Sequence, residues 1–220
     1  MGIKGIDVNE YQGDMDWDLV FADGIEFVMV RASLGPERID KNFFKNATEA
    51  LKNCIHVGAY HYCHARDVNA AKKEALHFIN TVKGRTMTYP LALYLEDDTL
   101  KELGSKVLTN IAVMFLETLA EFNYFPMICS SSYWFDHVLD DQRLRKYHHW
   151  TKFNGDKNDY TGTTGIWQCS KSGRVNGIES YVDLNRSNID YSLLIRFLGL
   201  NNLRRSRLDK FYVQSDKIKI

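Results

Sequence analysis

The segment PLALYLEDD, residues 90–98, ends in three consecutive carboxyl side chains directly after an apolar run. In a β-strand, successive side chains point to opposite faces, so the leucines of this run face one side, and Tyr94 and Glu96 face the other. A carboxyl group at a strand end can donate or accept a proton during catalysis. Glu96 is therefore a candidate general acid, and Tyr94 is its nearest neighbour on the same face.

Three further side chains with acid–base chemistry are expected at strand ends. Asp7 closes the run IKGIDV, His61 stands near the end of HVGAYHY, and Asp183 lies in YVDLN. In a parallel β-barrel such side chains converge on one rim, where barrel enzymes carry their chemistry. The alternative is that the acids cap helices or bind loop amides, and that His61 is a hydrogen-bonded histidine within the barrel.

Aromatic side chains are frequent beside these acids. Their flat faces suit the C–H faces of sugar rings, although each aromatic could equally belong to the core. The candidates are Tyr60, Tyr133, Trp134, Trp150 and Trp167. Hydrolysis of a glycosidic bond needs an acid for the leaving oxygen and an anion or neighbouring group for the oxocarbenium-like transition state. The combination of acids and aromatics therefore favours glycoside hydrolysis.

The elements that must position these residues follow from the hydrophobic pattern. Short apolar runs predict strands at residues 3–8, 25–32, 56–62, 91–96 and 126–131. Helical spacing predicts helices near residues 16–23, 40–53, 67–83 and 103–123. After Tyr147 the chain predicts three more strands, near 147–153, 165–169 and 179–184, without a long helix between them. The sequence thus predicts an α/β barrel of five βα units followed by about three strands, (β/α)5(β)3.

Length and composition limit the classes of function. The 220 residues suit one domain, and 28 basic residues balance 28 acidic residues, which does not favour nucleic acid or anionic membranes as partners. No apolar run approaches the roughly 18 residues of a membrane span. No secretory signal is visible at the N-terminus. The cysteines are widely spaced, which predicts reduced thiols rather than a metal site or a disulfide: Cys54, Cys63, Cys129 and Cys169.

Five segments of the chain resemble the motifs of one known family. They are GIDVNEYQGDMDW (5–17), FVMVRASLG (27–35), VGAYHY (57–62), IWQCS (166–170) and YVDLNRS (181–187). In this order and spacing they resemble glycoside hydrolase family 25, the Chalaropsis-type lysozymes of phage endolysins and bacterial autolysins. The resemblance implies a flattened, TIM-like barrel over residues 1–200. The basic residues after 200 predict a tail over 201–220 that is a solvated segment or, alternatively, a wall- or polyanion-binding one.

The resemblance also implies an activity. Family 25 enzymes hydrolyse the β-1,4 bond between N-acetylmuramic acid and N-acetylglucosamine in peptidoglycan, outside the cytoplasm and without metal or cofactor. By position, Glu96 matches the general acid, and Asp7 and Asp183 match the other acids of the pocket. We expect a monomer with these substrate-binding residues: Tyr94, Tyr60, His61, Arg31, Trp134, Trp150, Trp167 and Gln168. Arg31 could pair with Asp7 or Glu96, or form a purely structural ion pair.

The chain departs from the family motifs at several positions. Tyr94 stands where the family's D-x-E motif has its first aspartate, the residue expected to orient the 2-acetamido group of the substrate. Three hypotheses remain: a muramidase that uses Asp183 or Asp7 for the missing charge, a protein that binds glycan without cutting it, and a tyrosine nucleophile that needs a nearby base. Other departures are Cys129 and Cys169 for tyrosines, Lys152 for alanine and Asn154 for tyrosine.

Overall fold

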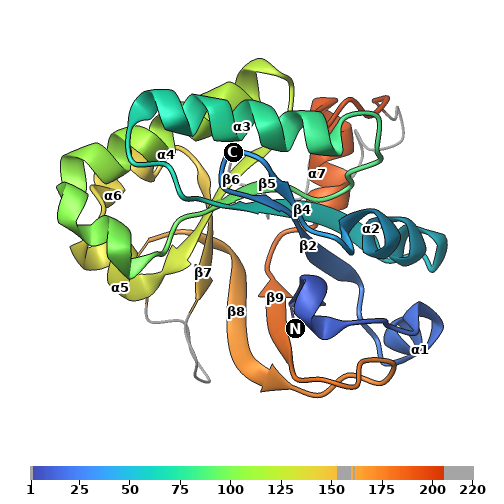
Figure 1. The fold of residues 1–220 in the computed structure, drawn as a ribbon. Helices are drawn as coiled ribbons and strands as arrows, with labels where there is room; N and C mark the ends of the chain where they lie inside the picture. The colour runs from blue at the N-terminus through green and yellow to red at the C-terminus, as the bar shows by residue number, and fades with distance from the viewer. Residues whose placement is uncertain (1, 153–159, 161, 206–220) are drawn as a thin grey trace.

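The computed structural model describes residues 2–152, 160 and 162–205, and within them nine strands form one sheet (Figure 1). The strands are β1 (Ile3–Val8), β2 (Phe27–Leu34), β3 (Arg38–Ile39), β4 (His56–Tyr62), β5 (Leu91–Tyr94), β6 (Pro126–Ser131), β7 (His148–Lys152), β8 (Thr164–Gly173) and β9 (Val182–Ser187). The helices are α1 (Trp17–Ala22), α2 (Phe43–Lys52), α3 (Val68–Val82), α4 (Gly104–Glu121), α5 (Ser132–His137), α6 (Asp141–Leu144) and α7 (Tyr191–Leu198). Two 3₁₀ turns, Glu10–Gln12 and Asp98–Leu103, follow β1 and β5.

The sheet closes into an irregular barrel of eight strands. Its order is β1-β9-β8-β7-β6-β5-β4-β2, β1 also pairs with β2, and β3 adds to the outer edge of β2. The barrel pairs β1–β2, β2–β4, β4–β5, β5–β6, β6–β7 and β7–β8 are parallel. Strand β9 runs antiparallel to both β8 and β1, and the edge strand β3 runs antiparallel to β2. The (β/α)5(β)3 prediction is therefore confirmed. The short elements β3, α5, α6 and α7 were not predicted, because a few residues carry little periodic signal.

Side-chain alternation on β5 follows the prediction. Leu91, Leu93 and Leu95 are fully buried in the layer between the strands and the helices, whereas Ala92 and Tyr94 contact the apolar cluster inside the barrel. The interior cluster also contains Phe27, Met29, Met127, Cys129, Trp150 and Ile166. Side chains therefore fill the interior of the barrel. Helices α3 and α4 cover the side of β4, β5 and β6, while β8 and β9 lie away from them (Figure 1).

One helical stretch, Asp98–Glu121, is long and apolar enough to cross a membrane when judged by length and composition alone. In the structure one face of this stretch, including Ile111 and Phe115, is fully buried against the rest of the protein, whereas Val107 is exposed. Phe115 contacts Phe78 of α3 and His61 of β4. The hydrophobicity of this stretch therefore has a structural explanation as a core helix.

The four cysteines are free thiols, of which Cys63 and Cys129 are buried, Cys169 is partly exposed and Cys54 is exposed. Burial raises the pKa of the Cys63 and Cys129 thiols above the ordinary value. They therefore act as small apolar side chains of the core.

The start of the C-terminal segment is tied to the barrel. Asn201 is 2% exposed, its Oδ1 accepts from the backbone N–H of Phe125, and its Nδ2 donates to the carbonyls of Met87 and Tyr89. Its φ of 53° lies in the left-handed region, which asparagine tolerates better than most residues. Most of the predicted basic tail, residues 206–220, lies outside the described residues.

Replacing Asn201 with Ala should destabilise the protein, because three buried backbone groups lose their partners and Ala disfavours a positive φ. We expect the free energy of unfolding to fall by about 2–4 kcal/mol in urea denaturation. Asn202→Ala is the matched control, since Asn202 is exposed and has a similar φ of 57°. The Asn202→Ala variant should lower the free energy of unfolding by less than about 1 kcal/mol. Equal losses in the two variants would show that the backbone conformation, not the buried contacts, is what matters.

Candidate active site

Two aspartates from opposite ends of the chain meet where β1 and β9 pair. Asp7 and Asp183 are direct partners in the antiparallel register of these strands. The side-chain amide of Gln168, on β8, donates to the Oδ2 atoms of Asp7 at 2.9 Å and of Asp183 at 3.1 Å. Asn185 Nδ2 adds a third bond, 2.8 Å to Asp7 Oδ2. Four side chains from three strands therefore form one hydrogen-bonded network at the end of the barrel.

The pKa values of both aspartates are raised above the ordinary value. Burial, and then the neighbouring Asp183, raises the pKa of Asp7 to about 7. Burial also raises the pKa of Asp183, opposed by a hydrogen bond from Asp7. Two buried carboxyl groups in contact cannot both ionise easily, so one of them retains a proton at a pH where free aspartate is ionised. The pair can therefore supply a negative charge or hold a proton near neutral pH.

Glu96 is connected to these aspartates through a lysine. Lys152, the last residue of β7, forms an ion pair with Glu96 Oε2, and its ammonium also contacts the hydroxyl of Tyr94. The side chain of Lys152 is 7% exposed, whereas that of Glu96 is 24% exposed. The positive charge of Lys152 also favours ionisation of Asp7 and Asp183, in opposition to their burial. The structure thus brings all three predicted acids into one electrostatic unit around a buried ammonium.

A tyrosine cluster forms the wall beside Glu96. The ring of Tyr94 stacks on Tyr62 with 5.0 Å between centroids, and it lies 5.7 Å from the ring of Tyr60. The hydroxyl of Tyr62 donates to the backbone carbonyl of Glu96 at 3.1 Å. Burial raises the pKa of Tyr94 far above the ordinary value, so its phenol is neutral. Tyr94 consequently offers a hydrogen-bonding group but no negative charge.

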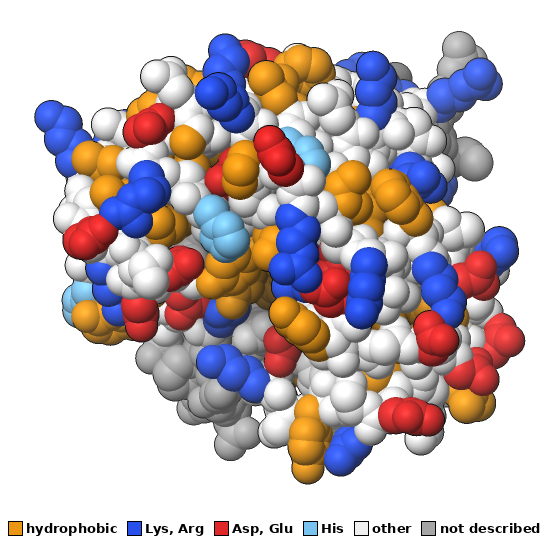
Figure 2. Space-filling view, in the orientation of Figure 1, with side chains coloured by type: hydrophobic (Ala, Val, Ile, Leu, Met, Phe, Trp, Pro, Cys, Tyr) orange, Lys and Arg blue, Asp and Glu red, His pale blue; other side chains and the backbone are white. Residues whose placement is uncertain are grey.

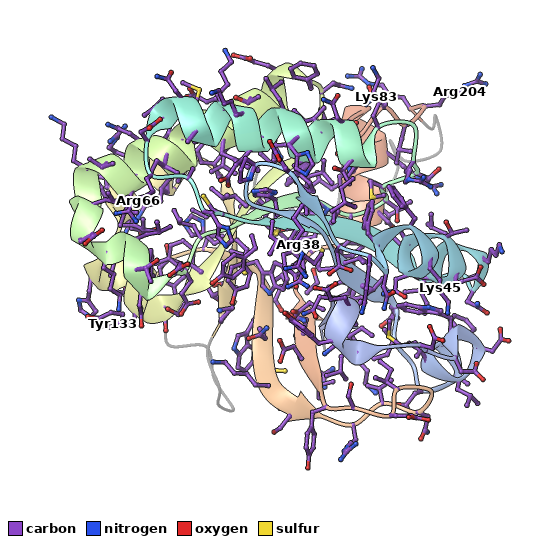
Figure 3. The ribbon with its side chains drawn as sticks, viewed as in Figure 1. Arg38, Lys45, Arg66, Lys83, Tyr133 and Arg204 are labelled. Carbon is purple, nitrogen blue, oxygen red and sulfur yellow. The ribbon has the colours of Figure 1, made fainter. Side chains whose placement is uncertain are left out.

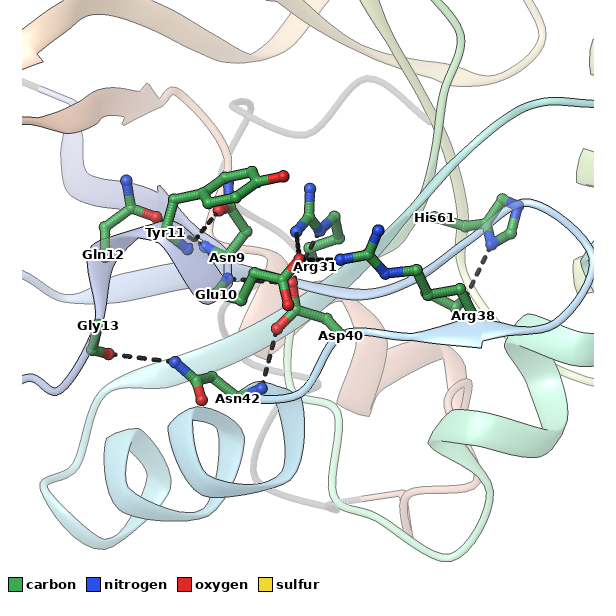
Figure 4. Close-up of polar contacts among 11 residues, drawn as sticks. Asn9, Glu10, Tyr11, Gln12, Gly13, Arg31, Arg38, Asp40, Asn42 and His61 are labelled. Carbon is green, nitrogen blue, oxygen red and sulfur yellow. Dashed lines mark hydrogen bonds and ion pairs between the residues drawn. The ribbon is translucent and has the colours of Figure 1, made fainter.

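Arg31 does not pair with Asp7 or Glu96, so that sequence prediction is wrong. Its guanidinium binds Asp40 at 2.8 Å and Glu10 at 3.1 Å, and Arg38 contacts the same glutamate (Figure 4). Asp40 is fully buried and also accepts from the backbone N–H of Glu10 at 3.0 Å. The turn after β2 brings Asp40 within reach of Arg31. The purely structural alternative is therefore the one observed, and it fixes the turn that follows Asp7.

His61 also lies away from the acids. It is fully buried, Nδ1 is 2.8 Å from Ser33 Oγ, and Nε2 is 2.9 Å from Glu74 on α3. Burial lowers the pKa of His61, which favours the neutral imidazole. Strand alternation directs His61 toward the helices and Tyr60 and Tyr62 toward the barrel interior. The prediction that His61 faces the rim and binds substrate is wrong, and the alternative of a hydrogen-bonded interior histidine is observed.

Two of the proposed sugar-stacking tryptophans are core residues. Trp134 on α5 is 1% exposed, and Trp150 on β7 is 0% exposed. Trp150 Nε1 donates to Asn185 Oδ1 at 2.8 Å, and its ring packs edge-on against Tyr60. Neither ring has a face open to a sugar, so both predictions are wrong. Trp167 is partly exposed, and alternation places it opposite Gln168 on β8.

Tyr133 on α5 is the exposed aromatic among the candidates, with 56% of its surface accessible. In Figure 3 it lies at the periphery, whereas Arg38 lies near the centre of the same view.

The visible face in Figure 2 carries interspersed charges of both signs, in keeping with the zero formal charge of the sequence. In the described part of the chain, no three His, Cys, Asp or Glu side chains form a group that could hold a metal ion.

Lys152, Asn185 and Tyr62 were not predicted as site residues, although a sequence signal for each exists. Each lies two positions from a predicted residue on the same strand, namely Trp150, Asp183 and Tyr60. Side chains two residues apart share a face of a strand, so the alternation rule would have identified them. Asn154, the other departure near Lys152, lies outside the described residues.

The chain is similar in sequence to glycoside hydrolases and their relatives. The model of "Glycosyl hydrolases family 25" matches residues 6–178. The autolytic lysozyme of Clostridium acetobutylicum is 27% identical over 185 residues, which cover 83% of this chain and 55% of the relative. The uncharacterized protein YegX of Escherichia coli (strain K12) is 28% identical over 190 residues, which cover 83% of this chain and 68% of the relative. The chain therefore spans about half the length of the Clostridium lysozyme.

Solved structures show the same architecture. The CTP1L endolysin aligns with a TM-score of 0.78 and 25% identity, over 88% of this chain and 69% of that one. The bacterial lysozyme from Streptomyces coelicolor aligns with a TM-score of 0.74 and 25% identity, over 93% of this chain and 99% of that one. The autolysin LytC from Streptococcus pneumoniae, solved in complex with a synthetic peptidoglycan ligand, aligns with a TM-score of 0.76 at 21% identity, over 84% of this chain and 46% of that one.

The aspartate pair leads to a prediction for the pH dependence of stability. Because the folded-state pKa of Asp7 is raised from 3.8 to about 7, its contribution to stability is fully present below about pH 4 and is lost as the pH rises to about 7. Over this window, the free energy of unfolding of the wild type should fall by about 2–4 kcal/mol relative to Asp7→Asn. Urea denaturation at a series of pH values measures this difference.

Asp18→Asn is the control for this experiment, because Asp18 is an exposed aspartate on α1. Its stability should follow the wild type in parallel across the pH range. If Asp7→Asn also ran parallel to the wild type, Asp7 would not hold a proton more tightly in the folded state, and the shared-proton interpretation would fail.

Proposed function

Because the chain belongs to glycosyl hydrolases family 25, we propose that it acts on peptidoglycan as a muramidase. The bond cleaved is the β-1,4 linkage between N-acetylmuramic acid and N-acetylglucosamine. Glu96 is the general acid, and the Asp7–Asp183 pair supplies the negative charge that stabilises the transition state. The cell wall is the place of action.

The observation that carries this proposal is the convergence of three acids from distant parts of the chain. Glu96 contacts Lys152, whose charge also acts on Asp7 and Asp183. A glycosidase needs a proton donor on the leaving oxygen and negative charge near the developing oxocarbenium ion. The partly exposed Glu96 can reach a substrate. Asp7 is buried, Asp183 is partly exposed, and hydrogen bonds from Gln168 to both and from Asn185 to Asp7 hold the pair in place.

The relatives support peptidoglycan as the substrate. The similar Clostridium protein is an autolytic lysozyme, and the similar LytC structure holds a synthetic peptidoglycan ligand. We extend this substrate class to the present chain. A single barrel can engage one glycan strand without a second copy, so we also propose that the protein acts as a monomer.

Tyr94 favours a second candidate function, glycan binding without cleavage. Its neutral, buried phenol occupies the position at which the family motif has an aspartate. A phenol can donate a hydrogen bond to the acetamido group but cannot stabilise positive charge there. Its raised pKa also argues against Tyr94 as a nucleophile, because that role needs a phenolate.

Replacing Glu96 with Gln distinguishes the two candidates. If Glu96 donates the proton, the variant should release reducing ends from purified peptidoglycan about 10²–10⁴-fold more slowly than the wild type. Turbidity loss of a wall suspension measures the same reaction. The affinity of Glu96→Gln for the insoluble wall, measured by sedimentation, should stay within a few-fold of the wild-type affinity, since only the proton is removed.

Glu102→Gln is the matched control, because Glu102 is an exposed glutamate that pairs with Arg66. Its rate should equal that of the wild type. A wild-type protein that sediments with the wall but releases no reducing ends would favour the binding function. Equal clearing by wild type and Glu96→Gln would assign the proton donor to another residue.

A further inference from the structure

Lys152 occupies an unusual place for a lysine. It ends β7 with its side chain 7% exposed, and it lies on the barrel-facing side of the strand with Trp150. Burying an ammonium group is costly unless carboxylates or other acceptors surround it. Among the described residues, its direct partners are the carboxylate of Glu96 and the hydroxyl of Tyr94. The position therefore depends on Glu96 being ionised.

Tyr94 holds this lysine in place. The ammonium lies 4.2 Å from the centroid of the Tyr94 ring, so it contacts both the face and the hydroxyl of the tyrosine. The ring itself is fixed between Tyr62 and Tyr60. Tyr62 also binds the backbone of Glu96, which fixes the other side of the ion pair. Lysine, tyrosine and glutamate are thus held as one unit.

This arrangement conflicts with proton donation. A general acid must carry a proton and approach the leaving oxygen, whereas Glu96 is paired as a carboxylate with a buried cation. Among the described residues, breaking the pair leaves the ammonium with Tyr94 and the more distant aspartates. The same pair would be harmless in a protein that only binds glycan.

We propose that Lys152 is a positioning residue that, with Tyr94, holds Glu96 in an ion-paired resting state and so limits the rate of glycan cleavage. The proposal rests on the muramidase function and adds a residue that controls it. In the resting state Glu96 keeps its negative charge. Cleavage requires that Glu96 separate from Lys152 and take up a proton before it protonates the glycosidic oxygen.

The test compares two substitutions of similar size at position 152. Lys152→Met removes the charge and keeps most of the apolar stem, whereas Lys152→Arg keeps the charge. We expect Lys152→Met to raise kcat for release of reducing ends from purified peptidoglycan about tenfold or more, with KM changed less than about threefold. Lys152→Arg should stay within about threefold of the wild type. Thermal unfolding followed by circular dichroism establishes that each variant folds.

Lys152→Gln gives a second neutral variant in case methionine at this position disrupts the barrel. Its amide carries no charge that could hold Glu96 as a carboxylate, so kcat should rise in this variant as well. A merely structural role for the ion pair predicts that Lys152→Met loses stability without gaining kcat. That result, an unchanged kcat, or a gain shared equally by Lys152→Arg would overturn the proposal.

Failure of the Lys152 restraint can be distinguished from failure of the proposed muramidase function. Cleavage by the wild type that Glu96→Gln abolishes supports the muramidase, whatever Lys152→Met does. Cleavage by Lys152→Met or Lys152→Gln but not by the wild type supports the restraint, because removal of the positive charge has then released a working acid. Wall binding by all variants without cleavage by any of them overturns the restraint, because removing the cation would not have released a working acid.

Discussion

The ion pair between Lys152 and Glu96 is the interaction on which the electrostatics of the acidic site depends. Charges at the end of a packed barrel are tolerated only in compensating sets, because an isolated buried ion is costly. Here one ammonium acts on three carboxyl groups, and the pKa values of the two aspartates are raised, which disfavours their ionising together. The site is therefore less negative than its three acids suggest. Its chemistry is set by how protons are distributed among the acids and not by the number of acids alone.

Closure of the barrel by an antiparallel strand makes this arrangement possible. Because β9 runs opposite to β1, Asp183 comes level with Asp7 although 176 positions separate them in the printed sequence. Gln168 from β8 then bridges the two carboxyl groups. A continued βα repeat would have placed a helix outside the last strands and a different register inside. The departure from eightfold repetition is thus what assembles the aspartate pair.

The polar network around Arg31 has a separate purpose from the acids. Arg31, Glu10 and Asp40 hold the turn that follows Asp7, so a residue expected at the site instead stabilises the backbone that carries it. His61 and Trp150 also support the scaffold, since His61 hydrogen-bonds Glu74 on α3 and Trp150 hydrogen-bonds Asn185 on β9. Residue type alone does not separate a ligand-binding side chain from one that supports the scaffold, because both use the same donors and acceptors.

The sequence by itself determined the (β/α)5(β)3 order of elements, the inward face of β5 and the three candidate acids, because strand periodicity and strand-end positions are local properties. It also identified the family through short motifs. Only the tertiary structure decided that His61 binds Ser33 and Glu74, that Trp134 and Trp150 are buried, that Arg31 binds Glu10 and Asp40, and that Lys152 meets Glu96 and Tyr94. These outcomes depend on which neighbours the closed barrel provides. Partner choice and burial are set by contacts between distant strands, and no local pattern encodes them.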